Sequence, residues 1–205
     1  MAENLGPLQA TRRTGIELFH QGPVALGFDL NDFWAWSVSD LVSNATRGRL
    51  AEYIIARGLG ISTAGVRNEW AAYDLVTPSG IKIEVKSAAY LQAWFQRRLS
   101  TISFSTRRSR AWDPGTGVLS SEVTHQADVY VFALLAHVDK PTVDPLDLAQ
   151  WSFFVVPTGL LSARTRSQHS ITLKTLEGMT KKVAFGDLAK AVEAAGTAAR
   201  PDAVT

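Results

Sequence analysis

The sequence predicts an α/β fold in which a mixed central β-sheet is flanked by helices. Residues 46–58 place apolar side chains at helical spacing, and residues 70–86 have the pattern of a β-hairpin. Residues 127–136 (ADVYVFALLA) form a nearly continuous apolar run, which is typical of an interior strand covered on both faces. The 205 residues are enough for one domain with a sizeable core.

We expect the chain to divide into an N-terminal arm over residues 1–27, a single domain over residues 28–196 and a flexible tail over residues 197–205. The arm is expected to be loose because it holds several Gly, Pro and Arg residues, and the tail is small and polar. Within the domain, further strands are predicted at 100–106, 151–156 and 182–185, and an amphipathic helix at 187–195. Residues 88–98 are predicted to be helical or irregular.

The hairpin has its turn at residues 77–80. Pro78 presets a turn conformation, and Gly80 suits the left-handed position that closes a three-residue loop. This loop length places Leu75 opposite Ile83 and Asp74 opposite Glu84. Because side chains alternate along a strand, one face is apolar and the other is charged. The apolar face holds Tyr73, Leu75, Ile81, Ile83 and Val85, and the charged face holds Asp74, Lys82, Glu84 and Lys86.

Asp74, Glu84 and Lys86 are the candidate catalytic residues on the charged face. Two carboxylates and an ammonium on a rigid sheet are suited to binding Mg²⁺ and acting on a phosphodiester. The triplet Glu84-Val85-Lys86 is short enough to arise by chance, so the prediction depends on the hairpin register. The alternative is the solvated face of an edge hairpin, on which these side chains form surface ion pairs.

Glu52 is the single carboxylate of the helix predicted before the hairpin. Leu50, Ile54 and Arg57 share one side of this helix, with Ala51 and Ile55 beside them. Glu52 either faces solvent or points toward a charged site, and both options are open from the pattern alone.

A helix with one glutamate, a strand near Asp74 and the triplet Glu84-Val85-Lys86 together resemble the PD-(D/E)xK nuclease superfamily. The resemblance covers about residues 46–92, with Tyr73 in place of the proline that gives the family its name. It implies a restriction-endonuclease-like core in which Asp74 and Glu84 bind metal, with a contribution from the backbone carbonyl of Val85. It also implies that Lys86 activates water, that Glu52 is an accessory acid and that Gln92 has a supporting role.

Residues 85–112 form a basic zone without any acidic residue, although the net charge of the chain is only +2. Arginine suits phosphate because its planar fork donates two hydrogen bonds, and aromatic rings can stack on bases. The alternative is a solvated loop with the aromatic residues in the core. The candidate nucleic-acid-binding residues are Arg97, Arg98, Arg107, Arg108 and Arg110, and the loop over residues 107–125 is the candidate reader of sequence.

Composition and motifs exclude several other chemistries. The chain has no cysteine, which excludes disulfides, thiolate catalysis and cysteine-ligated zinc. Its four histidines are scattered, and no glycine-rich phosphate-binding motif is present, so we expect neither a histidine–metal hydrolase nor a nucleotide cofactor. Residues 1–15 contain no apolar signal core, and the apolar run at 129–138 is too short to span a bilayer. We therefore expect a cytoplasmic protein with no membrane partner.

The hypothesis that follows is a Mg²⁺-dependent DNA endonuclease, with Mn²⁺ as a possible substitute and duplex DNA as the expected partner. Cutting both strands most simply uses two copies, so a homodimer is expected. By resemblance, the expected role is type II restriction or phage defence, with a Holliday-junction or repair nuclease as an alternative. Two different functions also stay open, namely a catalytically inactive nuclease-fold module that binds nucleic acid and a plain structural subunit.

Overall fold

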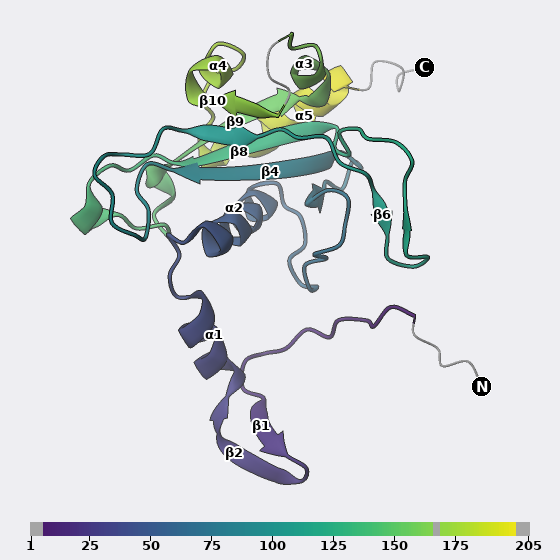
Figure 1. Ribbon diagram of the computed structural model, residues 1–205, viewed down its shortest axis with the longest axis vertical. Coiled ribbons are helices and arrows are strands. Elements are labelled where there is room, and N and C mark those ends of the chain that lie inside the picture. Colours follow the sequence, from purple (N-terminus) through teal and green to yellow (C-terminus); the bar gives the residue numbers. More distant parts are fainter. Residues whose placement is uncertain (1–5, 166–168, 200–205) are drawn as a thin grey trace.

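The computed structural model describes residues 6–165 and 169–199, so residues 200–205 of the predicted tail lie outside the described residues. At its centre is a mixed four-stranded sheet with the strand order β3-β4-β8-β9 (Figure 1). β4 and β8 are parallel, and β3 and β9 pair antiparallel to them. The strands are β3 (Leu75–Val76), β4 (Lys82–Ala89), β8 (Val129–Leu135) and β9 (Trp151–Pro157). The predicted α/β class is confirmed.

Two long helices cover one face of the sheet. α2 (Asn44–Gly58) and α5 (Leu188–Ala199) pack there against alternate residues of the strands. Every residue of β8 is buried, as expected for an interior strand. The fully buried side chains of this layer include Ile55, Ile83, Val131 and Phe153.

Shorter elements cover the other face of the sheet. A second buried cluster forms there around Phe104, Phe132 and Ile171. The covering elements are β5 (Ser103–Ser105), which pairs with β10 (Ser170–Thr172), and the short helices α3 (Thr158–Ser162) and α4 (Leu173–Glu177). β6 (Trp112–Asp113) and β7 (Val118–Leu119) form a small separate hairpin, and short 3₁₀ turns lie at Lys140–Thr142, Leu148–Gln150 and Phe185–Asp187.

The predicted hairpin is confirmed, including its register. Leu75 pairs with Ile83, the Thr77 amide donates to the Ile81 carbonyl over 3.0 Å, and Gly80 has a positive φ of 84°. Helix α5 holds the turn in place. The Ser79 hydroxyl donates to Glu193 over 2.8 Å, and a Cβ at Gly196 would lie 2.3 Å from the Cδ1 atom of Ile81. The site strand therefore begins from a fixed turn.

The prediction that Tyr73 belongs to the apolar face of the hairpin was wrong. Tyr73 packs instead against the cluster on the opposite face of the sheet, and the Lys82 ammonium lies 5.3 Å from its ring centroid. The reason is local, because β3 begins only at Leu75 and the regular alternation does not extend back to Tyr73.

The N-terminal arm has more structure than the sequence suggested. β1 (Leu18–Gln21) and β2 (Val24–Asp29) form a hairpin, and α1 (Leu30–Val38) follows it. Figure 1 shows these elements projecting from the layers around the central sheet. No residue of α1 is buried, and Trp36 is among the exposed large side chains.

Other boundaries differ in smaller ways. Residues 182–185 form only one bridge, from Val183 to Phe153, rather than a strand. Helix α5 extends to Ala199, into the segment predicted as tail, and residues 90–98 are irregular. Among the described residues, no helix combines the length and apolar character needed to cross a membrane.

Candidate active site

Asp74 is held at the open edge of β4, directly before the short strand β3. Its amide donates to the Ile83 carbonyl over 3.0 Å, and its Oδ2 atom accepts a 2.7 Å hydrogen bond from the Val85 amide. Burial raises the pKa of Asp74 and the nearby charge of Glu84 raises it further, while the Val85 amide, Lys86 and Arg67 oppose the shift. The carboxylate is therefore rigidly placed in a position that disfavours its negative charge.

Glu84 and Lys86 lie two residues apart on β4, so their side chains share one face of the sheet. The Lys86 ammonium donates to Glu84 Oε1 in a close ion pair. Their side chains are 19% and 30% exposed, so both are largely buried but keep some access to solvent. The structure thus brings together Asp74, Glu84 and Lys86, which we call the carboxylate–lysine cluster.

Tyr130 and His125 extend this cluster below the surface. Tyr130 lies opposite Glu84 in the parallel β4–β8 pairing, and its hydroxyl is 2.9 Å from His125 Nδ1. Burial raises the pKa of Tyr130, and the charges of Glu84 and Asp74 add to the shift. The pKa of His125 is lowered by burial and by the charge of Arg108. The phenol therefore stays protonated beside the two carboxylates.

Glu52 reaches the site indirectly, through Arg67. The Arg67 guanidinium forms two hydrogen bonds to the Glu52 carboxylate, one of them of 2.9 Å to Oε1, and lies 3.7 Å from Asp74 Oδ1. Glu52 is the main cause of the raised pKa of Arg67. These residues line a pocket of about 330 Å³ between α2 and the hairpin. The Arg67 guanidinium thus lies between the carboxylates of Glu52 and Asp74.

No three His, Asp or Glu side chains converge as a ready metal-binding group in residues 6–165 and 169–199. The acidic donors of the cluster are the two carboxylates of Asp74 and Glu84. Oxygen donors are the ligands that Mg²⁺ prefers, and this ion is usually bound by one or two carboxylates together with water and substrate phosphate. Two carboxylates therefore fit Mg²⁺ better than they fit an ion that the protein must surround with its own ligands.

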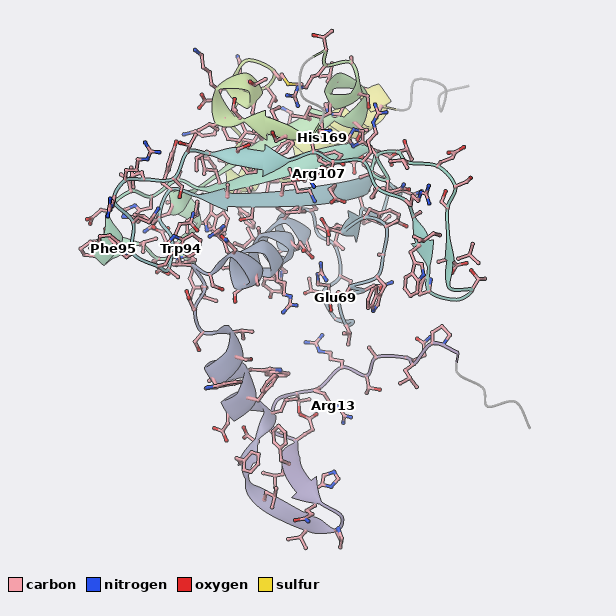
Figure 2. All side chains as sticks on the ribbon, viewed as in Figure 1. Arg13, Glu69, Trp94, Phe95, Arg107 and His169 are labelled. Carbon is pink, nitrogen blue, oxygen red and sulfur yellow. The ribbon has the colours of Figure 1, made fainter. Side chains whose placement is uncertain are left out.

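The predicted nucleic-acid-binding arginines are all exposed but fall into two places. Arg110 lines a second pocket that Asp74 and Glu84 also line, and Arg108 acts electrostatically on His125. Arg107 follows Thr106, whose amide donates to the His169 carbonyl over 2.9 Å (Figure 2). Arg97 and Arg98 follow the end of β4 instead, in the irregular segment near Trp94.

Gln92 is buried rather than presented to a ligand on the surface. Its side-chain amide donates to the Ala89 carbonyl over 2.9 Å and to the Ser100 hydroxyl over 3.1 Å. These bonds tie the segment after β4 to the strand.

Sequence reasoning did not single out Arg67 or Tyr130. Arg67 lies in an irregular segment, where no periodicity indicates which way a side chain points. Tyr130 could have been found from the alternation of the buried run, but only once the β4–β8 register was known. That pairing joins residues 46 positions apart in the sequence, and local patterns do not determine it.

An α/β core that gathers two carboxylates and a lysine beside one strand is an arrangement suited to phosphodiester hydrolysis, the chemistry of a nuclease. Comparison with protein-family models matches residues 34–175 to bacteriophage T4 endonuclease IV. The match spans well over half of the chain, from α1 to α4, so the chain belongs to the bacteriophage T4 endonuclease IV family. No curated protein matches the sequence significantly.

Proposed function

We propose that this nuclease is a metal-dependent DNA endonuclease of the PD-(D/E)xK type in which Asp74 and Glu84 bind Mg²⁺ or Mn²⁺. The observation that carries the proposal is the convergence of Asp74, Glu84 and Lys86, where the Val85 amide fixes the Asp74 carboxylate and Lys86 pairs with Glu84. Burial and the charge of Glu84 raise the pKa of Asp74, and a divalent cation between the two carboxylates would offset this unfavourable charge. The family description names an endonuclease, which supports DNA as the substrate.

The backbone carbonyl of Val85 is a suitable third donor. The amide and the carbonyl of one strand residue point to the same side of the strand. The Val85 amide points to Asp74, so its carbonyl faces the same open edge, beyond the end of β3. A metal bound there would lower the pKa of a coordinated water and neutralise charge on the phosphate.

Lys86 supplies the positive charge that the attacking water and the phosphate require. Its ammonium is anchored to one oxygen of Glu84 and keeps two further hydrogens for other acceptors. We propose that these hydrogens orient the attacking water and stabilise negative charge on the phosphate. Because the ion pair restrains the flexible lysine side chain, the ammonium is already oriented when the substrate binds.

Glu52 contributes by positioning Arg67 rather than by binding the metal directly. Its carboxylate holds two nitrogens of the guanidinium, which leaves further donors of Arg67 directed toward Asp74. A phosphate that enters next to Asp74 would meet an arginine whose orientation is already set.

The exposed arginines are proposed to bind the DNA backbone around this site. Arg110 and Arg108 are nearest to the cluster, Arg107 lies on the same segment, and Arg97 and Arg98 would extend the contact along the duplex. Gln92 would support that surface from beneath. Two copies would cut the two strands, so the homodimer stays a prediction, as does a restriction or phage-defence role.

The test is incubation of supercoiled plasmid with the purified protein and Mg²⁺ or Mn²⁺, with EDTA as the metal-free condition. Glu84→Gln removes a charge but keeps the shape and an oxygen for Lys86. Glu177→Gln is the matched control, because it makes the same change at an exposed position of α4. We expect metal-dependent nicking or linearisation by the wild type and the control, and none by Glu84→Gln.

Cleavage that persists in Glu84→Gln or in EDTA would overturn the assignment of the metal site. Binding of the plasmid without cleavage in either metal would instead favour the inactive binding module. A gel-shift assay on the same samples separates these two results.

A further inference from the structure

A pocket of about 450 Å³ is lined in part by Asp74 and Glu84 of the carboxylate–lysine cluster. Its other lining residues come from two segments that lie far apart in the sequence, one before the hairpin and one after β5. The residues of these segments that matter here are Trp70, Trp112 and Arg110.

The two tryptophans form an aromatic pair within the lining of the pocket. Their ring centroids are 5.1 Å apart, with an interplanar angle of 59°. Trp112 is held by the β6–β7 pairing, in which it lies opposite Leu119, whereas Trp70 remains 66% exposed. A large indole left in water next to a catalytic cluster indicates a surface that a ligand covers.

We propose that this pocket binds one nucleobase of the substrate, the base of a nucleotide adjacent to the scissile phosphate, by stacking on Trp70. This inference rests on the proposed function, because it places the phosphate at the carboxylate–lysine cluster. Every base presents a flat π-face, so stacking suits a DNA ligand of any sequence.

The charges around the pocket support a nucleotide rather than a simple apolar ligand. Arg110 lines the same pocket as the tryptophans and can bind the phosphate on one side of the stacked base. The carboxylates that also line it belong to the proposed reaction centre. A nucleotide that bridges the pocket would therefore have its base on Trp70 and its phosphate at the cluster.

A base that stacks on Trp70 must first unstack from the neighbouring bases of the DNA. Stacking on the indole ring offsets the free energy of unstacking, and this cost is smaller for a base that is already unpaired. Removing one such stacking surface reduces affinity by about 5- to 150-fold in other nucleic-acid-binding proteins. The effect on this nuclease should fall in that range.

The experiment compares Trp70→Ala with Trp70→Phe and with Trp36→Ala. Phe keeps an aromatic face and should restore most of the binding. Trp36 is a matched control, because it is an exposed tryptophan on α1, which projects from the central layers (Figure 1). Thermal melting of each variant verifies that it is folded.

The first readout does not depend on cleavage. Oligonucleotides with 5-iododeoxyuridine are irradiated with the protein in EDTA, and the crosslinked residue is identified by mass spectrometry. We expect crosslinks at Trp70 or Trp112. Crosslinks confined to other residues would overturn the proposal, even if the protein proves to be an active nuclease.

The second readout uses a cleavage position mapped on plasmid DNA. Oligonucleotides around that position each carry one abasic site. We expect wild type and Trp36→Ala to lose activity at one abasic position next to the cut, and Trp70→Ala to be insensitive there. If cleavage is intact and equally fast with the abasic site at every position, the base pocket is contradicted but the proposed function is not. If no metal-dependent cleavage occurs, the proposed function is contradicted.

Discussion

The two ends of β4 hold their charged side chains in opposite ways. At the hairpin end, Asp74 and Glu84 lie close enough for one to raise the pKa of the other. At the far end, Arg47 of α2 is only 3% exposed, yet its hydrogen-bond partners are neutral oxygen atoms. The guanidinium donates to the Val42 carbonyl and to Asn44 Oδ1 over 2.6 Å each, and to the Ser87 hydroxyl over 3.3 Å. Burial lowers the pKa of Arg47.

This difference separates a structural charge from a functional one. The hydrogen bonds of Arg47 connect the start of α2 to β4, so its charge is part of how the helix is held. Asp74 has like charge beside it and gains from a cation. We therefore expect substitutions at the hairpin end to abolish activity without loss of stability. Substitution of Arg47 should lower stability but leave the activity of the folded protein nearly unchanged.

The largest effect is expected from Asp74→Asn. The amide can still accept the Val85 hydrogen bond, so the hairpin should keep its shape. Because the negative charge that binds the metal is lost, the cleavage rate should fall by about 10³-fold or more. Single-turnover cleavage of plasmid measures this, and a loss of less than tenfold would mean that Asp74 does not bind the metal.

Lys86→Ala should have the next largest effect. Removing the ammonium leaves Glu84 unpaired and the phosphate charge less stabilised, so the rate should fall by about 10²-fold. DNA affinity should change much less, which a filter-binding assay in Ca²⁺ would show. An equal loss in rate and affinity would mark Lys86 as an ordinary phosphate contact.

Arg47→Met should lower the stability of the folded protein. It leaves the Val42 carbonyl and Asn44 without their donor, which should reduce the free energy of unfolding by about 2–3 kcal/mol. Urea unfolding measures the change. The specific activity of the folded fraction should remain near that of the wild type, and a large loss there would remove the distinction between the two ends of β4.

The pH dependence of stability should also differ between wild type and Asp74→Asn. The folded-state pKa of Asp74 is raised, so its contribution to stability is complete below the unfolded pKa and is lost as the pH rises through the folded pKa. In EDTA, Asp74→Asn should therefore melt at a higher temperature than wild type at pH 7. The difference should disappear toward pH 3, and added Mg²⁺ should reduce it at pH 7.

The smallest effect is expected from Arg110→Gln. Losing one phosphate contact should weaken DNA binding several-fold and reduce the slope of log K against log salt by about 1. Arg97→Gln is the comparison at the far end of β4. A larger effect from Arg97 than from Arg110 would place the DNA along the wrong end of the strand in our account.

The hairpin and the interior strand could be predicted because both are encoded locally. Pro78 and Gly80 set the turn, and the alternation from Ile81 to Lys86 then follows from the strand period. The apolar run at 127–136 shows its burial directly. Local sequence is therefore enough to place Glu84 and Lys86 on one face of the strand.

The remaining parts of the site depend on long-range packing. Whether Glu52 meets a metal or an arginine is decided by the irregular segment that carries Arg67, which has no periodic pattern. The contact between Trp70 and Trp112 joins one residue that precedes β4 in the sequence and one that follows it. Tyr73 lies on the other face of the sheet than predicted because β3 begins only at Leu75. The arm was expected to be loose because glycines in β-hairpins and in loose segments look alike, and Gly22 lies in the turn between β1 and β2.

The most direct test of the account is Mn²⁺ binding followed by electron paramagnetic resonance of the free ion. Wild type, Asp74→Asn, Glu84→Gln and the control Glu177→Gln would be titrated with an oligonucleotide present. The account predicts saturable binding by wild type and Glu177→Gln and its loss in both site variants. Equal binding by all four proteins would contradict the claim that Asp74 and Glu84 together form the metal site.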